Sequence, residues 1–166
     1  MAARGVHFSL DAAQVAALKA VAAAERVDFV QETFEEELWS ADRSRGEETD
    51  KAWDAIHRAL TDGELGWDNG SYPLNHAILG GKLLSEEEDY ILSLKSVEAV
   101  RDVAMALKGV TQEQLRAGYD QMDPESYGMP LSDEDFEYTW AYFQGLVTFY
   151  ERAAGKGLAV LFTVDQ

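Results

Sequence analysis

His57 is the ionisable residue whose sequence neighbours best suit chemistry. Asp54 precedes it by three residues and Trp53 by four, so a helix over residues 50–60 brings these side chains close together. A carboxylate beside an imidazole fixes its tautomer and raises its pKa, as a general base or a metal ligand requires. The alternative is a half-buried structural histidine that bonds to a loop carbonyl, because the sequence shows no partner nucleophile.

The charged residues near His57 also have a structural interpretation. Asp50, Asp54 and Arg58 follow one another at four-residue spacing. This spacing suits ordinary ion pairs on a helix, each worth roughly 0.2–0.5 kcal/mol. These residues therefore need no catalytic role.

A metal site has little support in the sequence. His7, His57 and His76 are the three histidines, and they lie in separate predicted elements that would all have to converge. The acidic runs at residues 35–37 and 86–89 lack the Asp-x-Asp-x-Asn-Gly spacing of calcium loops. We therefore predict solvated acidic faces and no metal.

Common cofactor and nucleophile motifs are missing. The sequence contains no Gly-x-Gly-x-x-Gly, no Gly-x-x-x-x-Gly-Lys-Ser/Thr, no His-Glu-x-x-His and no Gly-x-Ser-x-Gly. Glycines at positions 63, 66 and 70 lack the helix and lysine that phosphate binding needs, and acidic neighbours would repel a phosphate. We therefore predict no cofactor.

Two neighbouring elements would position a small-molecule site. The apolar spacing of residues 50–60 predicts a helix, and the stretch behind it, rich in Gly, Asp and Asn, predicts a long loop. The Gly80-Gly81 pair ends a short predicted helix over residues 74–79 and allows a backbone approach that a side chain would block. Such a site would lie between the 50–60 helix and the 63–81 loop and would use Trp53, Asp54, His57 and His76.

The wider pattern predicts an α+β fold. Apolar, β-prone runs predict strands at residues 5–9, 90–95 and 158–164. Helical spacing predicts helices that begin after Ser9 and near residues 27, 50, 74, 97, 111 and 132. Three strands among six or seven helices suggest a single domain over residues 1–166, with a small mixed β-sheet covered by several α-helices.

The last predicted helix offers a surface for a partner. Ser132 is its N-cap, and apolar residues from Phe136 to Ala154 follow at alternating spacings of four and three. Tyr138 and Tyr142 lie off this seam. We expect them to mark a partner surface, which a homodimer could also use, so the chain is predicted to be a monomer or a homodimer.

Composition excludes several classes of protein. Hydrophobic residues make up 46% of the 166 residues and charged residues 27%, as in folded globular chains. The formal net charge of -17 disfavours nucleic acid and membrane surfaces and favours a basic protein partner. There is no cysteine for disulfides or thiolate sites. No apolar run is long enough for a membrane span or a signal peptide, so a cytoplasmic location is expected.

Two spaced blocks resemble the YfbM-like family of bacterial proteins. The first runs from Thr49 to Thr61 and contains Asp50, Trp53, Asp54 and His57; the second runs from residue 72 to 81 and contains His76, Gly80 and Gly81. The family is known only as a domain of unknown function. The resemblance therefore implies a single bacterial α+β domain and brings no activity, cofactor or catalytic residue.

Two functions compete at this point. The leading hypothesis is a non-enzymatic domain that binds a protein partner of basic character, because the charge is strongly negative and no catalytic constellation is recognisable. The alternative is a small-molecule or enzymatic site beside the 50–60 helix. The two differ in whether His57 and His76 converge in an open pocket.

Overall fold

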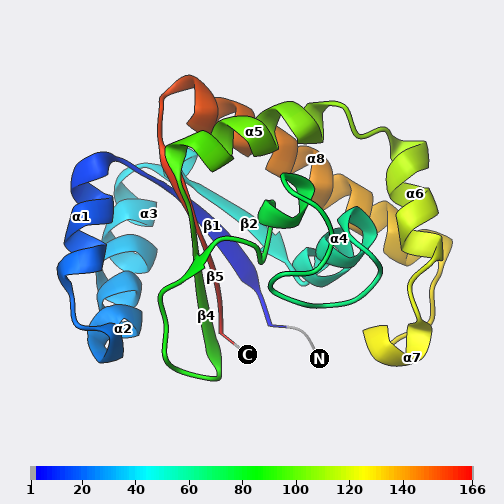
Figure 1. The fold of residues 1–166 in the computed structure, drawn as a ribbon, viewed down its shortest axis with the longest axis horizontal. Helices are drawn as coiled ribbons and strands as arrows, with labels where there is room; N and C mark the ends of the chain where they lie inside the picture. Colours follow the sequence, from blue (N-terminus) through cyan, green and yellow to red (C-terminus); the bar gives the residue numbers. More distant parts are fainter. Residues whose placement is uncertain (1–2, 166) are drawn as a thin grey trace.

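The computed structural model describes residues 3–165, which form a five-stranded sheet with helices on both faces (Figure 1). The strand order is β2-β1-β5-β4-β3, and every neighbouring pair is antiparallel. The strands are β1 (Gly5–Leu10), β2 (Gly46–Asp50), β3 (Lys82–Leu83), β4 (Tyr90–Lys95) and β5 (Ala159–Asp165). The α+β prediction is confirmed, but the predicted mixed sheet is wrong. Four helices, not one crossover helix, separate β4 from β5, and the chain re-enters the sheet in the opposite direction.

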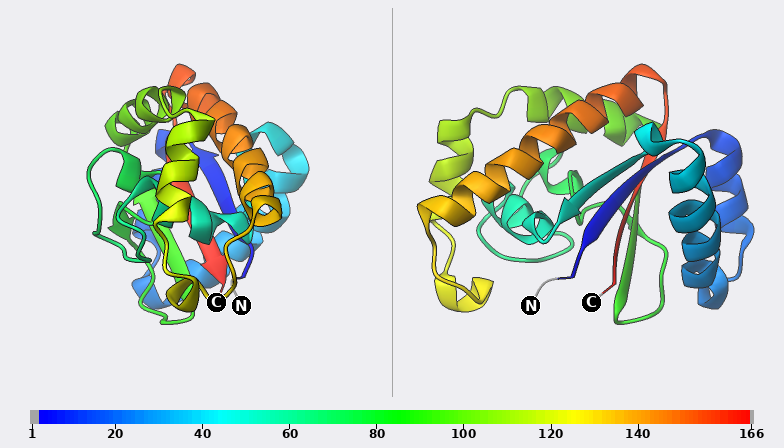
Figure 2. Two further views of the ribbon diagram at one scale, coloured as in Figure 1. Left: turned by 90° about the vertical axis from the view of Figure 1, so that its right-hand side faces the viewer. Right: turned by 180° about the vertical axis from the view of Figure 1, so that it is seen from behind.

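A group of N-terminal helices covers one face of the sheet (Figure 2). Its members are α1 (Ala12–Ala20), the 3-10 turn η1 (Ala23–Glu25), α2 (Arg26–Val30), the π-helix η2 (Gln31–Leu38), α3 (Trp39–Ala41) and the 3-10 turn η3 (Arg43–Arg45). Phe34 of η2 packs in the same core as Phe8 and Leu161 of the sheet. Asp11, not the expected Ser9, is the N-cap of α1 and forms a capping box with Gln14.

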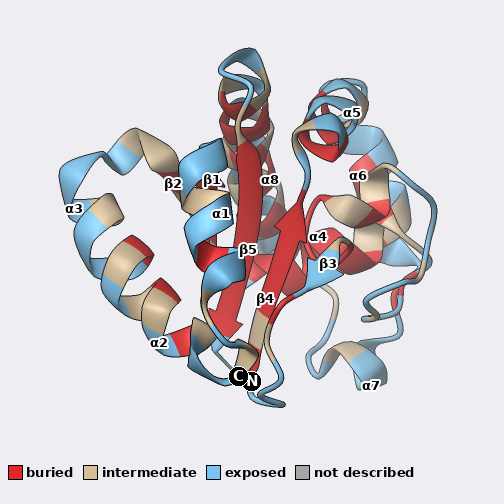
Figure 3. Ribbon diagram, turned by 60° about the vertical axis from the view of Figure 1, so that its left-hand side comes forward, coloured by how far each residue is buried: buried red, intermediate tan, exposed pale blue. Residues whose placement is uncertain are grey.

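The opposite face carries the larger core (Figure 3). Its helices are α4 (Ala52–Leu60), the 3-10 turn η4 (Leu74–His76), α5 (Val97–Lys108), α6 (Gln112–Asp120), α7 (Pro124–Tyr127) and α8 (Asp133–Gly155). The predicted N-cap of α8, Ser132, accepts from the Asp135 amide, and Phe136, Phe143 and Tyr150 are buried as the seam required. Among residues 3–165, no helix combines the length and the apolar character needed to cross a membrane.

Short polar elements are where the sequence prediction falls short. The strands β2 and β3 were not predicted, since β2 reads Gly-Glu-Glu-Thr-Asp and β3 has two residues. The helix expected over residues 74–79 is only the 3-10 turn η4. These elements depend on pairing and packing partners more than on local propensity.

Gly118 of α6 packs directly against the backbone of α4. A Cβ at this position would lie 2.1 Å from the carbonyl oxygen of Ala59. Gly118→Ala must therefore separate the two helices, and we expect a loss of about 1–3 kcal/mol in the free energy of unfolding, measured with urea. Gly155→Ala is the control, because a Cβ there meets nothing within 4 Å. Equal losses in both variants would contradict this packing.

Candidate functional site

Trp53 anchors α4 to the sheet. Its ring packs against Phe162 of β5 with centroids 5.7 Å apart, and its Nε1–H donates to the Ala3 carbonyl at 2.7 Å. The residue is 1% exposed. Trp53 therefore holds the helix in place and is closed to a ligand.

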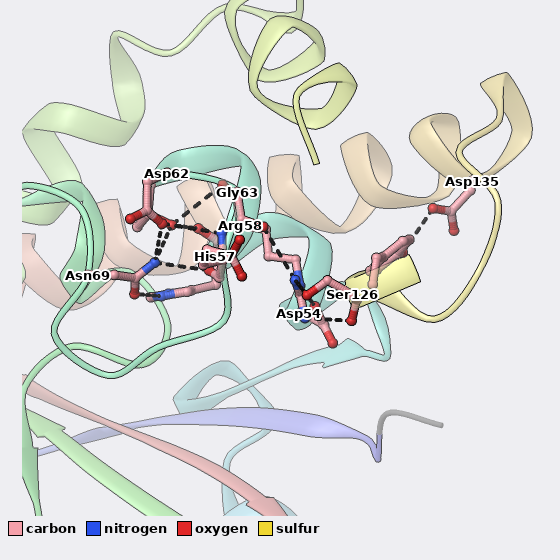
Figure 4. A network of polar contacts seen from close by, with 11 residues as sticks. Asp54, His57, Arg58, Asp62, Gly63, Asn69, Ser126 and Asp135 are labelled. Carbon is pink, nitrogen blue, oxygen red and sulfur yellow. Dashed lines mark hydrogen bonds and ion pairs between the residues drawn. The ribbon is translucent and has the colours of Figure 1, made fainter. Parts of the chain in front are cut away.

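Asp54 pairs with Arg58 one turn further along α4 (Figure 4). Nε of Arg58 donates to Oδ1 of Asp54 at 2.6 Å, and both residues are buried. Other N–H groups of the guanidinium bond to the Gly63 carbonyl and to the hydroxyl and carbonyl of Ser126 at 3.2–3.3 Å. The ion pair predicted from the four-residue spacing is present, and Asp54 is bound to Arg58 and not to His57.

His57 is a buried, neutral hydrogen-bond donor (Figure 4). Its Nε2 lies 2.9 Å from Oδ1 of Asn69. The amide nitrogen of Asn69 donates to three oxygens: Asp62 at 2.6 Å, Thr61 at 3.1 Å and the Glu64 carbonyl. The other amide atom, Oδ1, is therefore the acceptor toward His57. Nε2 of His57 must then carry the proton of this hydrogen bond. Burial lowers the pKa of His57, although the bond to Asn69 opposes this. His57 is therefore uncharged at neutral pH.

His76 does not meet His57 directly. Its Nδ1 lies 2.7 Å from Oδ1 of Asn75, whose amide nitrogen donates to the Asn69 carbonyl at 3.2 Å. The two histidines are thus joined only through two asparagines of the loop. Burial, followed by the charge of Lys95, lowers the pKa of His76. The arrangement connects the loop to α4 and does not form a catalytic pair.

Gly80 and Gly81 lie where the chain passes close to other backbone. A Cβ on Gly80 would lie 2.4 Å from the Asn75 carbonyl oxygen, and one on Gly81 would lie 2.6 Å from that of Leu94. Gly81 also has φ of +140°, which disfavours other residues. The backbone approach expected from the sequence is present, and it fixes the end of the loop.

Two buried side chains, His7 and Tyr150, donate hydrogen bonds to the carbonyl of Ala77. The sequence alone did not pair them. His7 of β1 donates to this carbonyl from Nε2 at 3.0 Å, and the Tyr150 hydroxyl of α8 donates at 2.8 Å. Burial, then the charge of Lys95, lowers the pKa of His7 to about 3. Nδ1 of His7 has no hydrogen-bond partner among the described residues. His7 is therefore a buried structural donor.

Lys95 and Ser93 of β4 hold the next carbonyls of the same segment. Nζ of Lys95 donates to the Ile78 carbonyl and to the Ser93 hydroxyl, and that hydroxyl donates to the Leu79 carbonyl at 2.8 Å. Lys95 is fully buried, which lowers its pKa well below the usual range. The signal in the sequence was the period of two in Tyr-Ile-Leu-Ser-Leu-Lys, which places both polar residues on one face of a buried strand.

Asp50 and the tyrosines of α8 form a third polar group. Asp50 ends β2 with φ of +45° and accepts from the Tyr138 hydroxyl at 2.6 Å. It also forms an ion pair with Arg4 at 3.3 Å. Tyr138 and Tyr142 contact each other edge to face, with centroids 5.0 Å apart, and both are half-buried. A partner surface at these tyrosines stays a prediction.

A cavity of about 600 Å³ opens beside Asp54, where α4, α7 and α8 meet. Its lining comes from these helices and from residues next to them: Lys51, Asp54, Tyr127, Gly128, Met129, Asp135 and Tyr138. The sequence placed a ligand site between α4 and the 63–81 loop, but hydrogen bonds join these two elements through Asn69. Of the cavity's residues beyond residue 120, the sequence singled out only Tyr138, and as part of a partner surface, so the fold alone brings them together.

The described residues offer no ready metal centre. Across residues 3–165, no three His, Asp or Glu side chains are grouped in a way that could hold a metal ion. Each of the three histidines donates a hydrogen bond to an oxygen that can only accept: the Ala77 carbonyl for His7, Asn69 Oδ1 for His57 and Asn75 Oδ1 for His76. The chemistry on display is hydrogen bonding and charge pairing.

The fold and these polar groups define a small α+β protein with an antiparallel sheet and a cavity beside its α4 ion pair. The chain belongs to the family described as a domain of unknown function, DUF1877, whose sequence model matches residues 1–163. The crystal structure of YfbM from Escherichia coli, a protein of unknown function, is similar, with a TM-score of 0.70 and 23% sequence identity over 97% of this chain and 99% of that one. No curated protein matches the chain. The resemblance to a YfbM-like family is thereby confirmed.

Burial of His7 makes stability depend on pH. The folded state protonates His7 only near pH 3, whereas an unfolded chain does so near 6.5. Unfolding therefore takes up a proton between these values, and this residue lowers the free energy of unfolding by about 1.4 kcal/mol per pH unit of acidification. The free energy of unfolding can be measured with urea at about pH 7 and at about pH 5. The decrease between these two pH values should be about 2 kcal/mol smaller in His7→Gln than in the native chain. The same loss in both would refute a neutral buried His7.

Asn69 satisfies the buried N–H of His57. Asn69→Ala leaves that donor unpaired, and we expect the free energy of unfolding to fall by about 1–3 kcal/mol. Asp68→Ala is the matched control, because Asp68 is an exposed neighbour in the same loop and should change stability by no more than about 0.5 kcal/mol. Chemical denaturation of both variants makes the comparison, and a stable Asn69→Ala protein would show that water replaces the bond.

Proposed function

We propose that this protein is a binding domain, without catalysis of its own, that receives a basic segment of a protein partner. The net charge of -17 supports attraction of such a partner. The groups nearest to a catalytic role argue against chemistry: His57 is buried and bonded to Asn69, and Asp54 is paired with Arg58. Burial closes His57 to a substrate, and the Asp54 carboxylate already holds a guanidinium.

The proposed receiving surface is a groove of about 520 Å³ between η2 and the sheet. Its lining comes from η2 and α3 on one side and from four strands on the other, and its polar and aromatic members include Gln31, Glu35, Trp39, Glu48, Tyr90 and Asp165. Arg4 also lines the groove, but it is paired with Asp50 at 3.3 Å. Carboxylates therefore outnumber free cations in this lining.

Two acidic runs far apart in the sequence lie on segments that are hydrogen-bonded to each other beside this groove. The Tyr90 hydroxyl donates to Glu35, and Arg26 donates to the Leu84 carbonyl at 3.2 Å. Glu35 begins the exposed run at residues 35–37, and Leu84 and Tyr90 flank the exposed run at residues 86–89. This convergence of negative charge around an aromatic groove is the observation that carries the proposal.

The aromatic lining suits a lysine or arginine side chain. The guanidinium of Arg43 already lies 4.2 Å from the ring centroid of Trp39. Such cation–π contacts are worth about 0.5–1 kcal/mol at exposed sites. The π-helix η2 supplies Gln31 and Glu35 to the same groove, and π-helical turns occur frequently at functional sites.

A synthetic octapeptide of alternating arginine and serine tests this function. We expect it to bind, to shift backbone amide signals around Glu35 and Tyr90, and to bind more weakly at high salt. Glu35→Gln keeps an acceptor for Tyr90 but removes one charge, and should weaken binding about fivefold. Glu113→Gln removes the same charge from exposed α6 and should leave binding unchanged.

Two results would overturn the proposal. One is no binding by a folded native protein at low salt. The other is equal weakening by Glu35→Gln and Glu113→Gln, which would indicate only a general attraction to net negative charge. A peptide with glutamate in place of arginine provides the sign control.

A second candidate function is a small-molecule site beside α4, and the cavity next to Asp54 favours it. Conversion of a ligand there would need a base or nucleophile free of internal bonds, whereas binding needs only the lining. A homodimer through Tyr138 and Tyr142 is a further prediction, decided by the molecular mass in solution. The protein-binding role remains the leading proposal because of the two acidic runs.

A further inference from the structure

We propose that the cavity between α4, α7 and α8 binds a small organic molecule that carries a guanidinium or a primary amine. This site is distinct from the η2 groove, since no residue lines both. It rests on the second candidate function, the small-molecule site beside α4, and not on the protein-binding function. Two carboxylates, Asp54 and Asp135, lie on its wall.

Each carboxylate keeps one oxygen free of hydrogen bonds among the described residues. Oδ1 of Asp54 takes the Nε–H of Arg58, while no described group donates to Oδ2. Oδ2 of Asp135 takes the hydroxyls of Tyr119 at 2.7 Å and Tyr127 at 2.9 Å, while no described group donates to Oδ1. Asp54 is only 8% exposed, so its open acceptor is held at the wall of the cavity and not in bulk water.

Apart from the exposed ammonium of Lys51, the described groups around the cavity offer open acceptors and no free donor. The guanidinium of Arg58 donates its hydrogen bonds to Asp54, Gly63 and Ser126. Burial and the bond to Asp135 raise the pKa of Tyr127, so its hydroxyl stays protonated and its proton is committed to that carboxylate. A ligand must therefore bring the missing donors, and a charged nitrogen brings them with the opposite sign of charge.

The remaining lining sets the shape and the second polar group of the ligand. Tyr127, Tyr138 and Met129 present apolar surface, and a volume of about 600 Å³ falls within the usual range for small-ligand sites. Lys51 is exposed and also lines the cavity. Its ammonium favours a ligand that carries a carboxylate in addition to the cation, as a basic amino acid does.

Three small probes test the chemistry. Arginine has both the guanidinium and the carboxylate, agmatine lacks the carboxylate, and citrulline replaces the guanidinium by an uncharged urea of the same size. Calorimetry and amide chemical shifts should show arginine bound at residues around Asp54 and Asp135, with citrulline at least about tenfold weaker. Agmatine should bind, but more weakly than arginine.

Matched variants place the ligand within the cavity. Asp135→Asn can still accept from both tyrosines but loses its charge, and should weaken arginine about tenfold. Glu134 is an exposed neighbour in the same helix turn and does not line the cavity. Glu134→Gln should therefore leave arginine binding unchanged. Lys51→Gln should weaken arginine but should not weaken agmatine, which has no carboxylate to pair with the ammonium. Met129→Trp should block all probes by filling the opening, without changing any charge.

Several outcomes would overturn the proposal. They are no binding of arginine or agmatine to the folded native protein, equal binding of citrulline, and arginine binding that survives both Asp135→Asn and Met129→Trp. Arginine shifts confined to Glu35 and Tyr90 would assign the cation to the η2 groove instead. That result would leave the peptide proposal intact, so the two proposals fail separately.

Discussion

The carbonyl groups of residues 77–80 lie buried between the sheet and α8, and each must find a donor there. A buried polar group without a partner costs about 1–3 kcal/mol. The donors are His7 from β1, Ser93 and Lys95 from β4, and Tyr150 from α8. Since all four are fully buried, sheet, helix and loop can assemble only together. Burial lowers the pKa of His7 to about 3 and that of Lys95 well below its usual range.

Elsewhere, some polar groups are used in hydrogen bonds within the protein, and others keep unbonded donors or acceptors. The loop that carries the buried carbonyls also carries Asn69, which binds His57, and Gly63, which binds Arg58. These bonds hold α4 against the loop and against α7. Acidic groups in the η2 groove and the α4 cavity keep open acceptors on the surface. The buried basic and imidazole side chains thus hold the fold together, whereas several carboxylates of the groove and the cavity keep open acceptors.

Local pattern predicted the elements whose own residues decide their structure. The helix α8, with its Ser132 cap and apolar seam, and the strands β1, β4 and β5 follow from spacing and β propensity. The strands β2 and β3 do not, because they are short, polar and stabilised by pairing with neighbours. The direction of β5 was missed for a related reason: strand polarity depends on the path of four intervening helices, which no local window contains.

At the candidate site, too, local features followed from the sequence, and long-range contacts did not. The sequence by itself determined the α+β class, the family, the helix around His57 and the Asp54–Arg58 spacing, because periodicity and i, i+4 geometry are local properties. Only the tertiary structure decided that Asn69 is the partner of His57, that Lys95 and His7 are buried, and that Asp54 and Asp135 share a cavity. Burial and long-range contact set hydrogen-bond partners and pKa values, and both exist only once distant segments have packed together.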